Sequence, residues 1–189
     1  PLGQVMLTTN LSGRLGSALV EYLPDTQLIL LLGAMIVSLI LGMGLPTPVA
    51  YIIVALALVP FMQQIGIPPL QAHFFVFYFA VFSTLTPPVA VSVLAAAKLG
   101  EATFLSTAKD SMKIALTTFI IPFAFVFSPE LMLFPNVTWG TMLAVFEVVF
   151  VQLAVSVASY GFLIRSLNGF ERGVYSFVAL SGFLGFTYD

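Results

Sequence analysis

The 189-residue sequence contains no cysteine, which excludes a disulfide framework and any cysteine-ligated metal or redox centre. Charged side chains make up only 7% of the residues, against about 25% in an ordinary soluble domain, so they cannot build a solvated surface. The net charge of −2 argues against a nucleic-acid partner, because such proteins need a basic face. The only histidine, His73, stands alone, which favours a packing role over proton relay. With no metal-ligand cluster and no nucleophile–base pair in the sequence, we expect neither an enzyme nor a cofactor.

Apolar side chains are abundant instead: they make up 60% of the residues, and the mean hydropathy is +1.10. These values predict an all-α polytopic membrane protein, because a helix satisfies its own backbone polar groups in lipid. The chain opens at Pro1 without a leader sequence, and its last apolar stretch, from about Val174, is shorter than the about 20 residues that cross a bilayer. We therefore expect a fragment of a longer membrane protein.

The apolar runs divide the chain into three parts: an amphipathic interfacial helix, a region of interrupted segments and an extension with one full and one truncated span, at residues 1–27, 28–134 and 136–189. In the first part, Arg14, Glu21 and Asp25 alternate with leucines in a helical rhythm, as is typical of a helix at a membrane interface. In the last part, we expect the full span at residues 141–164, with Trp139 as its interface anchor.

Residues 28–62 consist of two apolar arms of about 14 residues on either side of the sequence GMGLPTP, residues 42–48. At about 1.5 Å per residue, each arm reaches about 21 Å, short of the about 30 Å of a hydrocarbon core. A long broken helix and a re-entrant hairpin both fit, but four glycines and prolines within seven residues favour the hairpin. Because irregular backbone at that depth must be buried in protein or line a wet cavity, the hairpin tip is a candidate site.

Residues 73–97 repeat this pattern, with an apolar run interrupted by Ser83-Thr84-Leu85-Thr86-Pro87-Pro88. The paired prolines predict a discontinuous transmembrane helix. Two interrupted apolar segments close together in sequence point to the midplane binding site of a transporter. A polar connection at residues 98–113 and a further span at residues 114–134 follow.

The basic residues predict the orientation in the membrane. They gather in two loops, with Lys98, Lys109 and Lys113 in one and Arg165 and Arg172 in the other. By the positive-inside rule both loops are cytoplasmic, so the hairpin opens to the outside. Arg14 then lies on the outer side, against the rule.

A buried carboxylate within the span 141–164 also needs an explanation. Glu147 is costly there unless it is paired, and Gln152 follows it. Because Glu147 is near the outer end of the predicted span, we favour a structural role over a proton site.

Several long motifs of this sequence, in this order, resemble a known family. The motifs are Leu41–Ile52 (LGMGLPTPVAYI), Ala72–Phe79 (AHFFVFYF), Leu85–Ala90 (LTPPVA), Lys113–Leu116 (KIAL) and Phe119–Phe123 (FIIPF). Over residues 10–135 the chain is similar to the large membrane subunit of TRAP (tripartite ATP-independent periplasmic) transporters. The spans after residue 136 resemble the carboxyl-terminal extension of fused permeases, which often work with a TAXI-type binding protein.

This resemblance implies a secondary transporter with an elevator mechanism and two inverted repeats, located in the inner (cytoplasmic) membrane of a bacterium or archaeon. A periplasmic TAXI- or TRAP-type binding protein delivers an organic acid anion, and Na⁺ usually drives uptake, with H⁺ as the other candidate in TAXI-type systems. Residues 28–97 match the second repeat, so the first repeat and the small-subunit region are missing partners.

The resemblance also implies which residues form the site. The candidate substrate- and cation-binding residues are Gly42, Gly44, Pro46 and Thr47 at the tip and Ser83, Thr84, Thr86 and Pro87 at the break, with Gly42, Gly44 and Thr86 as Na⁺ candidates. Pro48 stands where many relatives have threonine or another small residue, so no side-chain contact is carried over there.

Three alternatives stay open beside this hypothesis. A binding-protein-independent Na⁺/dicarboxylate symporter has the same kind of hairpin. In a purely structural membrane subunit the interruptions would be kinks. An intramembrane enzyme is the weakest alternative, because no acid or nucleophile pair lies at depth.

Overall fold

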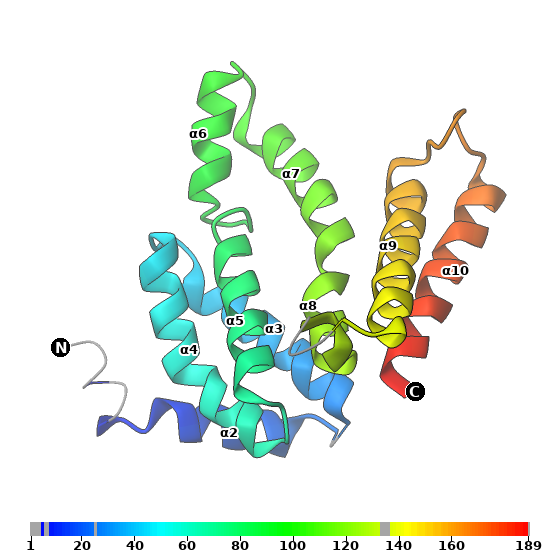
Figure 1. Ribbon diagram of the computed structural model, residues 1–189. Coiled ribbons are helices and arrows are strands. Elements are labelled where there is room, and N and C mark those ends of the chain that lie inside the picture. The colour runs from blue at the N-terminus through cyan, green and yellow to red at the C-terminus, as the bar shows by residue number, and fades with distance from the viewer. Residues whose placement is uncertain (1–4, 6–7, 25, 133–136, 189) are drawn as a thin grey trace. The chain divides into compact units, whose positions relative to one another are not determined.

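The computed structural model describes residues 5, 8–24, 26–132 and 137–188, and in these ranges every helix or strand assigned is a helix (Figure 1). The chain forms two compact units, Pro1–Met112 and Lys113–Asp189. The predicted all-helical class is confirmed for the described residues. Parts of the predicted segments 1–27 and 114–134, including Asp25 and residues 133 and 134, lie outside them.

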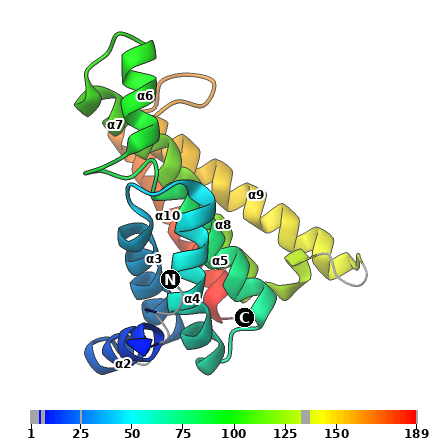
Figure 2. The ribbon, with the colours of Figure 1, turned by 90° about the vertical axis from the view of Figure 1, so that its left-hand side faces the viewer.

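Among its described residues, the first unit contains five complete helices of known bounds and the start of another: α2 Leu11–Tyr22, α3 Gln27–Gly42, α4 Thr47–Gln64, α5 Pro69–Phe82, α6 Val91–Leu99 and α7 Phe104–Thr118, which ends in the second unit. Helices α3, α4 and α5 pack on one another (Figures 1 and 2). Helix α2 lies across one end of this group, where it packs on α4. Phe61, Phe75 and Phe79 fill the core of this group, and the rings of Phe75 and Phe79 meet edge to face at 4.9 Å. Small residues allow close approach, since Gly16 of α2 lies against the Phe61 ring.

The α3–α4 hairpin has longer arms than its sequence predicts, with 16 and 18 residues. Helix α4 begins at Thr47 because Pro48, in its first turn, is compatible with a helix start, where its missing N–H costs nothing. By length and composition α4 can cross a membrane, as can Phe104–Phe127 and Trp139–Tyr160 among the described residues. The prediction that both arms are too short to span is therefore wrong for the length of α4, whereas the re-entrant hairpin itself stays a prediction.

The predicted polar connection at residues 98–113 is also wrong for its second half, because α7 already begins at Phe104. Lys109 and Lys113 are one turn apart and exposed, whereas Ala108 and Ala115 are buried. These residues form the two faces of an amphipathic helix, not a loop.

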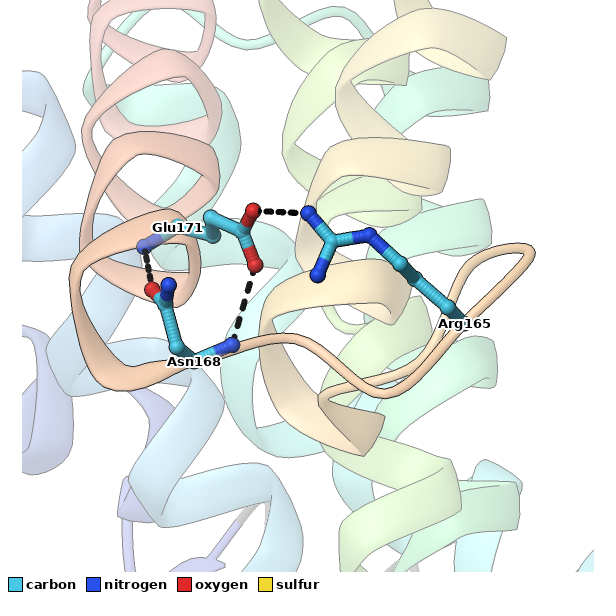
Figure 3. Close-up of polar contacts among 3 residues, drawn as sticks. All are labelled: Arg165, Asn168 and Glu171. Atoms are coloured by element: carbon cyan, nitrogen blue, oxygen red, sulfur yellow. Dashed lines mark hydrogen bonds and ion pairs between the residues drawn. The ribbon is translucent and has the colours of Figure 1, made fainter.

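The second unit contains the end of α7, α8 Ile120–Phe127, a 3₁₀ turn η1 Pro129–Met132, α9 Trp139–Tyr160 and α10 Gly169–Tyr188. Helices α9 and α10 form an antiparallel pair that packs closely, since a Cβ on Gly182 would lie 2.5 Å from Cγ2 of Val151. Helix α10 has 20 residues and begins about five residues earlier than the apolar stretch suggests. Asn168 and Glu171 cap this start, and Glu171 also pairs with Arg165 (Figure 3).

Candidate functional site

The hairpin tip and the helix break, predicted separately from the sequence, lie against each other (Figures 1 and 2). Gly42, the last residue of α3, is buried, and a Cβ placed on it would lie 2.9 Å from Cβ of Ser83 and 3.4 Å from the carbonyl oxygen of Ala80. Only a residue without a side chain allows this approach. Gly42 ends α3 and Ser83 is the C-cap of α5, so the C-terminal ends of these two helices meet, and α4 runs back from the tip (Figure 1).

A second glycine of the tip faces the far side of the break. Gly44 has φ +74°, a conformation that favours glycine, and a Cβ on it would lie 3.2 Å from Cγ1 of Val89. Val89 comes just before α6, and Gly44 comes just before α4. The first turns of α4 and α6 therefore start near each other.

The hydroxyl groups of the break use their hydrogens locally. Ser83 Oγ donates to the carbonyl of Ala80 at 2.6 Å, Thr84 Oγ1 to that of Val81 at 2.8 Å, and Thr86 Oγ1 to that of Phe82 at 2.9 Å. These bonds cap the last carbonyls of α5. A hydroxyl that already donates its hydrogen still presents oxygen lone pairs, which suit a hard cation better than an anion.

Backbone groups of both interruptions are left open. Within the described part of the chain, the carbonyl oxygens of residues 43–45 and 85–89 accept no hydrogen bond. The first turns of α4 and α6 also have no side-chain cap, and their N-caps are Pro46 and Ala90. The site thus offers carbonyl oxygens for a cation and helix N-termini for an anion.

The remaining predicted residues lie at the edges of this arrangement. Pro46 and Thr47 are at the start of α4, and Pro87 is exposed in the break, where its peptide bond to Pro88 is cis. Nothing in this region is charged, because residues 26–97 contain no Asp, Glu, Lys or Arg. An ion bound by these residues therefore meets only dipoles from this stretch of the chain.

Two polar features away from the break were not predicted. His73 Nδ1 and the hydroxyl of Tyr51 are hydrogen-bonded at 2.9 Å, which joins α5 to α4 beside an open apolar concavity of about 350 Å³. Gln71, 4% exposed, has a side-chain oxygen without a partner among the described residues. A lone glutamine in an apolar helix was the available signal for it. The Tyr51 contact agrees with a packing role for His73.

Comparison with known proteins places the tip and the break in a family context. The family model of the tripartite ATP-independent periplasmic transporter, DctM component, matches residues 2–139, which include both interruptions and end at the start of α9. No match was found among curated proteins or solved structures. The resemblance to the large TRAP subunit is confirmed by the match, whereas the TAXI-associated type stays a prediction. Because the match covers most of the chain and three of its helical stretches can cross a membrane, the chain belongs to the DctM component family of multi-pass TRAP transporter permeases.

Proposed function

We propose that this chain contributes the hairpin tip and the helix break that bind a coupling Na⁺ ion and an organic acid anion in a TRAP transporter. A periplasmic binding protein of the TAXI or TRAP type delivers the anion to the site. The observation that carries this proposal is the contact of Gly42 with Ser83, since it joins two interruptions that are 41 positions apart in the sequence.

The proposed ligands of Na⁺ are backbone carbonyls of Gly42 and Gly44 and the hydroxyl oxygen of Thr86. The Gly44 carbonyl accepts no hydrogen bond from the described residues, whereas the Gly42 carbonyl accepts one from the N–H of Leu45 at 3.3 Å and keeps a second lone pair. The Thr86 hydroxyl donates to Phe82, so its lone pairs face no competing donor in the described structure. The anion binds near the first turns of α4 and α6, where N–H groups without side-chain caps carry partial positive charge.

The absence of charged residues between positions 26 and 97 supports coupling of the two ligands. A single ion taken from water into this region would lose hydration without meeting an opposite charge. A cation and an anion bound together neutralise each other, so each raises the affinity for the other. This mutual dependence is what symport requires.

The wider arrangement is also part of the proposal. The tip enters the membrane as a re-entrant hairpin from the periplasmic side, and the unit moves as the second inverted repeat of an elevator. The first repeat and a small-subunit region complete the permease in the inner membrane. Gly42 is buried against Ser83 of this chain, whereas Gly44 and Pro46 are exposed, and irregular backbone exposed within a membrane supports a protein partner around the tip in place of lipid.

The test is Na⁺-dependent uptake by the permease with its binding protein in proteoliposomes. Thr86→Val removes one ligand oxygen at nearly constant volume, and we expect the Na⁺ concentration for half-maximal uptake to rise about tenfold, the equivalent of about 1.4 kcal/mol. Thr107→Val is the matched control, because its hydroxyl makes the same kind of bond to a carbonyl four residues earlier, at 3.1 Å, on α7. Unchanged Na⁺ dependence in Thr86→Val, with normal expression, would refute the ligand assignment.

A second variant tests the tip. Gly44→Leu forces a side chain into a positive-φ position and against Val89, so uptake should be lost. Gly66→Leu has the same backbone strain, with φ +88°, but nothing within 4 Å of its Cβ, so it controls for strain alone. If Gly44→Leu retained as much uptake as an active Gly66→Leu variant, the contact of the tip with the break would not be needed. Omission of the binding protein distinguishes the proposed system from a symporter that works alone.

A further inference from the structure

An open apolar groove of about 300 Å³ runs along the second unit between α8, α9 and α10. Its lining includes Ile120 of α8, Val155 and Ser159 of α9, and Ser176, Leu180 and Phe183 of α10. At about 1.5 Å per residue, Ser176 and Phe183 are about 10 Å apart along α10, so the groove follows the helices. Because α9 is apolar and long enough to cross a membrane, the groove lies at the depth of lipid acyl chains.

Arg172 stands at one end of this groove. Its Nε donates to the carbonyl of Ala158 at 3.0 Å and its Nη2 to that of Ser159 at 3.4 Å, and Ala158 and Ser159 both line the groove. A guanidinium has five N–H groups, so these two bonds leave others for a ligand. The hydroxyl of Ser159 forms no hydrogen bond with a described residue. This end of the groove therefore offers a cation and a hydroxyl donor.

A second cation, Lys113, stands at the same end. Its Nζ lies 5.0 Å from the centre of the ring of Tyr160, the residue that follows Ser159. Lys113 is exposed and comes seven residues, about two helical turns, before Ile120 in the helical stretch Phe104–Phe127, so the two side chains share a face. An ammonium group on an aromatic ring keeps its N–H donors for an anion.

The acidic residues described in the second unit do not neutralise these two cations. Glu171 is paired with Arg165. Glu130 comes before α9, and Glu147 stands 13 residues before the end of α9, about 20 Å away along the helix. The end of the groove is therefore positively charged.

An occupant of this groove must be apolar along the helices and anionic at the end where Lys113 and Arg172 stand. A small free anion has no apolar part, and an uncharged helix would leave both cations without a counter-ion. We propose that the groove binds an anionic phospholipid, with one acyl chain between α8, α9 and α10 and the phosphate at Lys113 and Arg172. Basic pockets between membrane helices recognise lipid headgroups in this way. The loop after α9 is predicted to be cytoplasmic, and the cytoplasmic leaflet is the one that carries anionic lipids.

The test is photolabelling of the permease in liposomes that contain a trace of phosphatidylglycerol or phosphatidylcholine, each with the same diazirine-bearing acyl chain. After proteolysis, mass spectrometry measures the label on α8 and α10. We expect phosphatidylglycerol to label the groove more than phosphatidylcholine does, and Lys113→Gln to lower its labelling about fivefold. Lys98→Gln, an exposed lysine of α6, is the matched control and should change nothing. Lys113 is chosen because Arg172 also closes the end of α9.

Two results would overturn the proposal. Equal labelling of the groove by the two lipids in wild type, or equal phosphatidylglycerol labelling in wild type and Lys113→Gln, would mean that the cations do not select a lipid. If neither lipid labels the groove, another part of the permease covers it.

A second pair of variants tests the apolar part of the site. Leu180→Trp places a larger side chain in the groove, whereas Leu153→Trp makes the same change at an exposed position of α9 outside the lining. Labelling of α8, which neither substitution alters, should fall in Leu180→Trp and stay at the wild-type level in Leu153→Trp. Equal labelling in the two variants would show that the chain does not lie in the groove. None of these readouts depends on uptake, so failure here leaves the tip-and-break proposal intact.

Discussion

The interruption between α9 and α10 and the interruption between α5 and α6 treat their polar groups in opposite ways. In the first, Arg172 donates to the carbonyls of Ala158 and Ser159 at 3.0 and 3.4 Å, which closes the end of α9. At the start of α10, Asn168 and Glu171 cap each other, and Arg165 pairs with Glu171 (Figure 3).

In the second interruption, side chains close only the end of the incoming helix. Ser83, Thr84 and Thr86 cap α5, but α6, which begins at Val91, has no side-chain cap at its N-cap Ala90. Carbonyls of residues 85–89 accept no hydrogen bond from the described residues. Helices α2 and α3 also start without side-chain caps, so an open start alone does not mark a site. The break differs because a second open start, that of α4, lies beside it through Gly44 and Val89.

The comparison teaches that an interrupted helix signals a binding site when the helix that follows it starts without a side-chain cap and a second such start lies beside it. In the α9–α10 loop side chains cap both helix ends, although the carbonyls of residues 162–164, 166 and 167 also accept no hydrogen bond from the described residues, so the two interruptions differ in their helix ends and not in their open carbonyls. We therefore expect changes at the break to affect transport and changes in the α9–α10 loop to affect stability.

Of the changes that compare the two interruptions, Gly42→Ala should have the largest effect. The new Cβ would lie 2.9 Å from Cβ of Ser83, which rotation of the serine hydroxyl cannot relieve, so the tip must move away from the break. We expect more than a tenfold loss of uptake and a destabilisation of about 1–3 kcal/mol in thermal unfolding. Gly173→Ala is the control, because nothing lies within 4 Å of its Cβ.

A second substitution shows whether the contact itself is responsible. Ser83→Gly removes the opposing Cβ, so the double variant Gly42→Ala/Ser83→Gly should recover most of the lost stability relative to Ser83→Gly alone. Strictly additive destabilisation would mean that Gly42 and Ser83 are not in contact, and the comparison between the two interruptions would lose its basis.

The positions of the interruptions could be predicted from the sequence because glycine and proline act locally on the backbone. The contact between Gly42 and Ser83 could not, since it depends on how α3, α4 and α5 pack. The sequence also could not show which carbonyl oxygens stay without a hydrogen bond. The serines and threonines of the break cap α5 in the structure, but from the sequence they could equally have turned toward a ligand.

Helix lengths were underestimated where polar residues lie on helices. Lys109 and Asp110 predicted a loop but occupy the exposed face of α7. Asn168 and Glu171 stand three positions apart, and this capping pattern was readable in the sequence. Apolar content alone therefore placed the start of α10 too late.

An intermediate effect is expected from Arg172→Gln, which removes the cation at the end of α9. The lost hydrogen bonds to Ala158 and Ser159 and the lost packing on Gly161 should destabilise the permease by about 1–2 kcal/mol in thermal unfolding. The Na⁺ dependence of uptake should not change. Arg14→Gln, at an exposed position on α2, controls for loss of charge. If Arg172→Gln shifted the Na⁺ dependence as Thr86→Val is expected to, the distinction between a structural and a binding interruption would fail.

The smallest effect is expected from acidification of the α9–α10 loop. The backbone N–H of Asn168, and then Arg165, hold the pKa of Glu171 below its ordinary value of 4.5. A carboxyl group with a lowered pKa stabilises the folded state above its unfolded pKa, and this contribution is lost as the pH falls through the lower folded value. Glu171→Gln keeps an oxygen for Asn168 but lacks the charge. The difference in melting temperature between wild type and Glu171→Gln should therefore be constant from pH 7 to 6 and shrink toward pH 3, always below the effect of Arg172→Gln. A melting-temperature difference that grows on acidification would show that the ionised Glu171 carboxylate does not stabilise this loop. The α9–α10 loop could then no longer be contrasted, as the interruption that its own side chains stabilise, with the break between α5 and α6.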